Sequence, residues 1–174
     1  MLRHAWRARR AACCALLLLA PLASAQNVTS DERALKVAFL YNFALYTEWP
    51  MPLPDGLNLC VLGHDDLGPV LDTLAGRQIN GKSVILRRLD AGAGISGCHV
   101  IYIAAAGDAK SARIVRELRQ KPILSVTDAA GADFSMISLS RQGMRLVFDI
   151  DNSSARAAGL VLSSKLLRLA HSVH

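Results

Sequence analysis

The sequence predicts an α/β fold, namely a single three-layer domain with a mostly parallel sheet, an antiparallel C-terminal strand pair and helices on both faces. Apolar segments of strand length alternate with helical segments in the order β-α-β-β-α-β, a pattern typical of parallel sheets covered by helices. The 174 residues are 52% hydrophobic and 20% charged, as in globular chains that bury a core. No repeat, low-complexity tract or linker divides the chain, which indicates one domain from about residue 30 to 172.

The N-terminal segment has the three parts of an export signal. Residues 1–10 carry four arginines and no acidic residue, residues 11–20 are apolar, and Ala23-Ser24-Ala25 fits a signal-peptidase site. We therefore expect a cleaved signal peptide over 1–25 and a domain over 26–174 of an exported protein. The alternative is an uncleaved membrane anchor, but the apolar run has about half of the roughly 20 residues that a membrane span needs.

The distribution of charge argues against a nucleic-acid partner. The formal net charge of the chain is +6, but the residues after Ala25 hold 16 Lys and Arg against 14 Asp and Glu. A nucleic-acid-binding domain needs a concentrated basic surface. We therefore expect no binding to nucleic acid.

The first element of the exported chain is predicted to be a helix near 31–47. Thr29 and Glu32 have the spacing of a capping box. From residue 37 to residue 46, Asn42 is the one clearly polar side chain, so the helix is apolar nearly all round. Such a helix is either deeply buried or shared with another chain.

The later elements follow from apolar runs and the turn residues between them. Gly63 ends the first strand, Asn80-Gly81 precedes the second, and Arg141-Gln142-Gly143 turns the antiparallel pair. We expect the second, first and third strands to be neighbours in that order. The predicted elements are strand 57–62, helix 66–75, strands 84–89 and 99–103, helix 108–120, strand 123–126, antiparallel strands 135–140 and 144–150, and helix 152–170.

Large apolar side chains are concentrated between Phe39 and Trp49, more than one helix face can cover. A spacing of three and four residues predicts that the inward face consists of Ala34, Val37, Ala38, Tyr41 and Leu45. The outward face would then hold Phe39, Phe43, Tyr46 and Trp49. We expect these four residues to bind a partner, because a large exposed apolar patch marks an interaction site. The alternative is that the closing helix, 152–170, packs over them.

Cys60 and Cys98 are the cysteines that remain after removal of the signal peptide. In an oxidising compartment, two cysteines most simply form one disulfide. The strands that carry them are neighbours in the expected order, which favours this bridge. The alternative is a pair of buried, reduced cysteines.

The motifs that suggest chemistry are weak. His64 and Asp65 follow the first strand, at the carboxyl edge where open α/β sheets bind ligands, although the same residues suit a turn or a helix cap. Residues 92–97 fit G-x-G-x-x-G, but they lead into a strand and not into a helix, so we interpret them as a loop. Ser163-Ser164-Lys165 lacks the S-x-x-K spacing of a Ser–Lys hydrolase. We expect no catalytic residue, no metal site and no cofactor, and hence no enzyme.

Six segments, taken together and in order, resemble the YfiR family of periplasmic proteins. The resemblance covers about residues 31–170. The segments are Ala38–Phe43 with Glu48-Trp49-Pro50, Leu59–Gly63, Cys98–Ile103, Ile123–Asp128, Phe148–Ile150 and Ala158–Leu167.

The resemblance implies a periplasmic regulator with an α/β fold that tends to form dimers. The best-known member binds and represses the periplasmic part of an inner-membrane diguanylate cyclase, which lowers cyclic di-GMP and biofilm formation, and an outer-membrane lipoprotein can sequester it. Cys60 and Cys98 match one family disulfide, whereas the second cysteine pair of that member has no counterpart after Cys98. The alternative function is a periplasmic small-molecule-binding sensor that uses a pocket near His64 and Asp65.

Overall fold

The computed structural model describes residues 24–53, 56–63, 66–90, 94–104, 114, 117–118, 121–129 and 135–174, with side chains from residue 31 onward. Two compact units, Met1–Asp31 and Glu32–His174, make up the chain, and the second contains the sheet. The predicted signal peptide, 1–25, lies almost wholly outside the described residues, so its cleavage stays a prediction.

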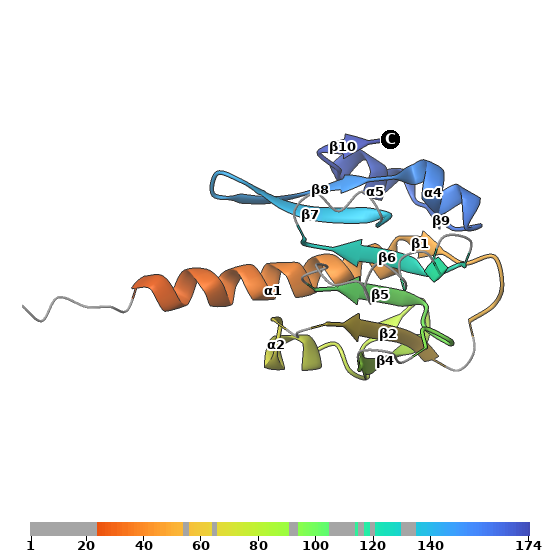
Figure 1. Ribbon diagram of the computed structural model, residues 1–174, viewed down its shortest axis with the longest axis horizontal. Helices are drawn as coiled ribbons and strands as arrows, with labels where there is room; N and C mark the ends of the chain where they lie inside the picture. Colours follow the sequence, from red (N-terminus) through yellow and green to blue (C-terminus); the bar gives the residue numbers. More distant parts are fainter. Residues whose placement is uncertain are drawn as a thin grey trace, which may run out of the picture. The chain divides into compact units, whose positions relative to one another are not determined.

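The body of the second unit is a mixed sheet. Within the described residues it has eight strands in the order β10-β8-β7-β6-β5-β2-β4-β3 (Figure 1). The strands are β2 (Gly56–Leu62), β3 (Gln78–Ile79), β4 (Lys82–Leu89), β5 (Val100–Ile103), β6 (Leu124–Thr127), β7 (Ile137–Gln142), β8 (Arg145–Ile150) and β10 (Ser172–Val173). Neighbours from β4 through β2, β5 and β6 to β7 are parallel, whereas β7 pairs antiparallel with β8. The expected order of the first three predicted strands, now β4-β2-β5, is confirmed.

The central strands are buried on both faces, which is why most of their residues are apolar. All four residues of β5 and all four of β6 are buried. Side chains of β2 and β5 alternate between two apolar clusters: Leu59 and Tyr102 lie in the first, and Cys60 and Ile101 lie in the second. Each face of the sheet is therefore covered by its own apolar cluster at the central strands.

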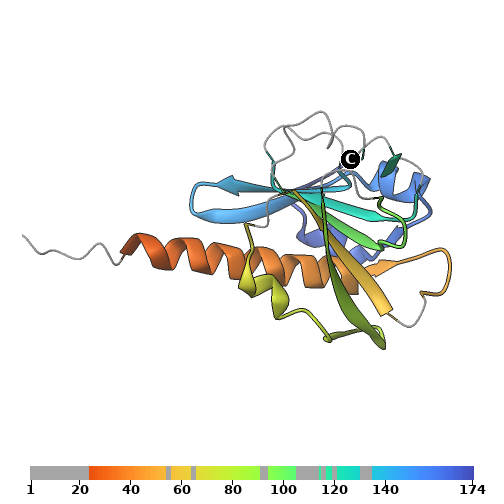
Figure 2. The same cartoon turned by 60° about the horizontal axis from the view of Figure 1, so that its bottom comes forward.

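The first apolar cluster includes the inward side of α1 (Ser24–Leu45), whose residues from Glu32 onward run along one face of the sheet (Figure 2). The helix begins earlier than predicted, so Thr29 lies within it and is not its cap. The predicted inward face was correct at Val37, Tyr41 and Leu45, which lie in or against the core, and wrong at Ala34 and Ala38. Val37, Leu40 and Phe43 are buried, whereas Ala34 and Ala38 are exposed. An almost wholly apolar helix allows several such faces, and the packing against the sheet selects one of them.

The second apolar cluster lies on the other face and contains Ile114 and Leu118. Both residues come from the predicted helix 108–120, most of which falls outside the described residues. Helical cover of this face, and with it the three-layer arrangement, stays a prediction.

The predicted closing helix, 152–170, is wrong. Its residues form α4 (Asn152–Ala157), β9 (Val161–Leu162) and α5 (Ser164–Leu169). Gly159 has φ 78° and its N–H bonds to the carbonyl of Arg156, while the N–H of Leu160 bonds to that of Ala155. These two bonds end a helix in a left-handed turn that glycine adopts at low cost.

The break allows β9 to pair antiparallel with β1 (Thr47–Glu48), the segment that follows α1. The N–H of Ser163 then bonds to the carbonyl of Tyr46, and the Ser163 hydroxyl accepts a hydrogen bond from the N–H of Leu166 at the start of α5. Ser163 therefore caps α5. The short helix predicted over 66–75 is reduced to α2 (Pro69–Asp72).

Candidate functional site

A cavity of about 320 Å³ opens where three segments enter the sheet. Each of these segments directly precedes a strand, and the amino ends of parallel strands meet at one edge of a sheet. The cavity is lined by Trp49, Pro50, Met51, Pro52 and Leu53 before β2, by Ile95, Ser96, Gly97, Cys98 and His99 before β5, and by Lys121, Pro122 and Ile123 before β6. Its volume lies at the lower end of the range for small-molecule pockets.

Two neighbouring strands are joined beside this cavity by a disulfide. Cys60 lies in β2, Cys98 lies just before β5, their Cα atoms are 5.9 Å apart, and the two sulfurs are bonded. The expected bridge between the first and third predicted strands is therefore present. Cys98 is 4% exposed and is the member of the pair that lines the cavity.

His99 links two of the segments that line the cavity. Its Nδ1 accepts a hydrogen bond of 2.9 Å from the backbone N–H of Asn58, and its carbonyl accepts one of 3.3 Å from the Trp49 indole. Burial lowers the pKa of His99 below its usual value. Because Nδ1 accepts this hydrogen bond, the neutral ring carries its own proton on Nε2.

The four residues expected to bind a partner have different environments. Phe43 is fully buried, and its ring lies 5.7 Å from that of Phe39 and 4.9 Å from that of Phe148. The expectation that Phe43 faces outward was therefore wrong, because α1 turns this side chain toward β8. Phe39, Tyr46 and Trp49 are each half-buried.

The partly exposed residues continue into an apolar strip beside β1 and β9. Lys165 Nζ lies 4.9 Å from the Tyr46 ring centre and donates a hydrogen bond of 2.7 Å to its hydroxyl. Met51 is 74% exposed and Val161, which pairs with Glu48, is 57% exposed. We call Tyr46, Trp49, Met51 and Val161 the β1–β9 surface.

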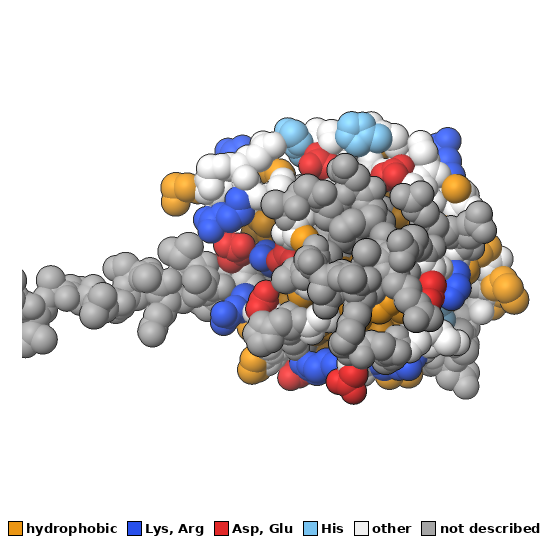
Figure 3. Space-filling model, viewed as in Figure 1, with side chains coloured by type: hydrophobic (Ala, Val, Ile, Leu, Met, Phe, Trp, Pro, Cys, Tyr) orange, Lys and Arg blue, Asp and Glu red, His pale blue; other side chains and the backbone are white. Residues whose placement is uncertain are grey.

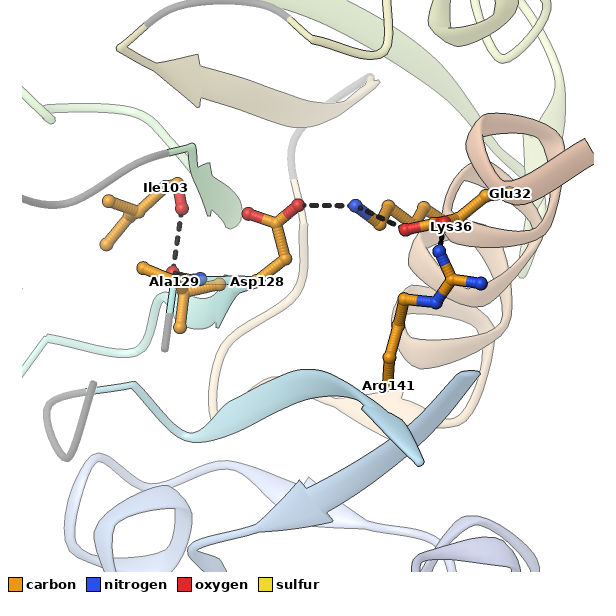
Figure 4. Close-up of polar contacts among 7 residues, drawn as sticks. Glu32, Lys36, Ile103, Asp128, Ala129 and Arg141 are labelled. Atoms are coloured by element: carbon orange, nitrogen blue, oxygen red, sulfur yellow. Dashed lines mark hydrogen bonds and ion pairs between the residues drawn. The ribbon is translucent and has the colours of Figure 1, made fainter. Parts of the chain in front are cut away.

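At the carboxyl ends of the parallel strands, opposite the cavity, a cluster of charged side chains links α1 to the end of β6 and to β7 (Figure 4). Lys36 Nζ lies 2.7 Å from the Asp128 carboxylate and 3.2 Å from that of Glu32, and Arg141 of β7 lies 3.0 Å from Glu32. Burial lowers the pKa of Lys36, but the hydrogen bonds and charges of Asp128 and Glu32 outweigh it, so the net pKa is raised. Lys36 therefore stays protonated at neutral pH and acts as a cation between the two carboxylates.

Polar contacts behind this cluster fix the end of β6. The Thr127 hydroxyl donates a hydrogen bond of 2.8 Å to the carbonyl of Ile103, and it accepts one of 3.1 Å from the N–H of Ala129 (Figure 4). Asp128 is thereby held between two anchored residues. These contacts explain why its carboxylate meets Lys36 at the α1 face.

The surface in Figure 3 carries acidic and basic side chains interspersed over its described part.

Among the described residues, no set of three His, Cys, Asp or Glu side chains is arranged to hold a metal ion. The part of the chain that the structure describes also contains no helix with the length and apolar character needed to span a membrane.

The predicted ligand residues, His64 and Asp65, lie outside the described residues, so their role stays a prediction. The cavity at the opposite strand ends was missed by sequence reasoning, which considered the carboxyl edge alone. Two signals pointed to it. Pro50, Pro52 and Pro122 precede strands, and the Cys98-His99 pair sits at the start of another.

Comparison with known proteins identifies the family. No curated protein matches the chain. A family model described as YfiR/HmsC-like matches residues 33–171, which is more than half of the chain and almost all of the second unit. The chain therefore belongs to the YfiR/HmsC-like family.

Proposed function

We propose that this protein is a periplasmic regulator that binds the periplasmic part of an inner-membrane diguanylate cyclase and represses it. Family membership is the observation that carries the proposal. The Cys60–Cys98 bridge supports it, because disulfides persist in oxidising compartments such as the periplasm. Repression would lower cyclic di-GMP and biofilm formation, and neither catalysis nor a cofactor is part of the proposed role.

The β1–β9 surface is the proposed contact with the cyclase. It combines half-buried aromatic residues, Tyr46 and Trp49, with the exposed apolar side chains of Met51 and Val161. Interfaces draw most of their binding energy from a few aromatic anchors in such settings. A second copy of this chain and an outer-membrane lipoprotein are further proposed partners, and both would compete with the cyclase if they used the same surface.

The test is the cyclic di-GMP content of cells that lack the gene. Deletion should raise the cyclic di-GMP content, and expression of the wild-type protein in the periplasm should lower it to the original level. The Tyr46→Ala variant should lower the cyclic di-GMP content less than the wild-type protein does, because the substitution removes an aromatic anchor that lies outside the cavity. Met144→Ala is the matched control, since Met144 is 97% exposed at the β7–β8 turn. Unchanged cyclic di-GMP in the deletion strain would contradict the proposal.

A direct measurement complements the cellular one. The periplasmic domain of the cyclase, immobilised on a sensor, should retain wild-type protein and the Met144→Ala variant equally. Loss of one true anchor costs about 2 kcal/mol or more, so Tyr46→Ala should bind at least about thirtyfold more weakly. Equal binding of all three proteins would place the contact elsewhere.

The second candidate function is that of a periplasmic small-molecule sensor. The cavity beside Trp49 and Cys98 favours it, since it has the volume of a small-ligand pocket and polar groups at a few positions. This site differs from the one expected near His64 and Asp65.

A further inference from the structure

We propose that the cavity at the amino ends of β2, β5 and β6 binds a small, largely apolar carboxylic acid. Its body would lie against the apolar lining and its carboxylate would lie toward Lys121. The inference does not rest on the proposed cyclase partner, because it is tested on the isolated protein and at Lys121, which is not part of the β1–β9 surface, although Trp49 and Met51 belong to both.

The lining determines the apolar part of the ligand. Ile95, Cys98 and Ile123 are 1%, 4% and 5% exposed and belong to the second apolar cluster. Trp49 and Leu53 pack against the first apolar cluster. The cavity thus lies where the two clusters meet at the edge of the sheet, and its walls offer apolar contact from both sides.

The charges around the cavity determine the polar part. Lys121 is exposed and cationic, and among the described residues that line the cavity none is acidic. His99 is neutral and presents an N–H at Nε2, because Nδ1 is engaged by the backbone of Asn58. The Lys121 cation, the His99 donor and the Ser96 hydroxyl favour an anion with few polar atoms, and they disfavour a cation or a sugar.

The size of the cavity excludes large occupants. A volume of about 320 Å³ accommodates a small molecule and is too small for a folded partner segment. A medium-chain carboxylate matches both the apolar walls and the single cation. Decanoate is therefore the probe of choice, with decanol and decylammonium as neutral and cationic analogues of the same length.

Trp49 supplies a built-in reporter. The chain contains two tryptophans, Trp6 and Trp49, and Trp6 lies in the predicted signal peptide. In a Trp6→Phe background, all tryptophan fluorescence comes from the wall of the cavity, whether or not the signal peptide has been removed. Titration with decanoate below its micelle-forming concentration should change this fluorescence saturably, decanol should bind more weakly, and decylammonium more weakly still.

Substitutions at Lys121 test the charge without disturbing the core. Lys121→Gln should weaken decanoate binding about two- to fivefold, the upper range for an exposed ion pair, and should leave decanol binding unchanged. Lys121→Glu should reverse the preference, so that decylammonium binds better than decanoate. Arg168→Gln is the matched control, because Arg168 is an exposed cation on α5 and does not line the cavity.

Two results would overturn the inference. Absence of a saturable fluorescence change with decanoate would show that the cavity does not bind this class of ligand. Equal affinity for the three probes, or an unaltered decanoate affinity in both Lys121 variants, would show nonspecific apolar adsorption only. Either result leaves the proposed regulation of the cyclase untouched.

Discussion

Replacing Phe43 by alanine should lower the stability of the folded protein, although the residue belongs to the aromatic segment that the sequence predicts to bind a partner. The Phe43 side chain is fully buried and contacts the rings of Phe39 and Phe148. Its removal deletes apolar contacts and leaves a cavity between α1 and β8. Removal of a buried phenylalanine ring costs about 3–5 kcal/mol, and the lost ring pairs are included in that range.

The expected change is large enough for a simple thermal measurement. In a domain of this size, 1 kcal/mol lowers the thermal midpoint by roughly 3 °C, so Phe43→Ala should lower it by about 10–15 °C. Circular dichroism at increasing temperature, together with urea unfolding at 25 °C, measures both quantities. Phe43→Leu fills most of the space and should cost about 1.5 kcal/mol.

Tyr46→Ala is the matched comparison from the same segment. Tyr46 is half-buried at the margin of the first apolar cluster and contacts the cation of Lys165. An exposed cation–π contact contributes about 0.5–1 kcal/mol, so the midpoint should fall by only a few degrees. A Phe43→Ala variant with a wild-type midpoint and weakened partner binding would refute this assignment and return Phe43 to the partner surface.

Three further predictions concern the bridge, the charged cluster and the cavity histidine. The double variant Cys60→Ala/Cys98→Ala should lose about 4 kcal/mol in urea unfolding, because the bridge closes a loop with a sequence separation of 38; equal stability of oxidised and reduced wild type would contradict this. Lys36→Gln should cost about 2–3 kcal/mol, since it strands the 15% exposed carboxylate of Asp128, while Lys36→Arg should cost less. Because the pKa of Lys36 is raised in the folded protein, its contribution to stability is complete below pH 10.5 and is lost as the pH rises through the folded pKa. The unfolding curves of the wild type and of Lys36→Gln should therefore converge in strong alkali. His99 has a lowered pKa, so the unfolded chain takes up its proton first and wild-type stability should fall as the pH drops below 6.5; a His99→Gln variant that keeps the whole acid dependence would contradict this.

The order of strands and the disulfide could be predicted from the sequence. Runs such as Leu57–Leu62 and His99–Ile103 are apolar on both faces, and that pattern alone indicates central parallel strands. Local turn chemistry at Asn80-Gly81 and Gly143 located the strand boundaries. These features depend on residues close together in the chain, and so they can be predicted from the sequence without knowledge of the fold.

The inward face of α1 and the fate of the closing segment were decided by the tertiary structure. Val37, Leu40 and Phe43 are inward because they meet β-strand residues far away in sequence, and a helix with apolar residues on every side carries no local record of that choice. Gly159 interrupts the closing segment, and the residues after it pair with β1. The cavity arises in the same way: Trp49, Cys98 and Lys121 are far apart in the chain and are brought together only because parallel strands align their amino ends at one edge of the sheet.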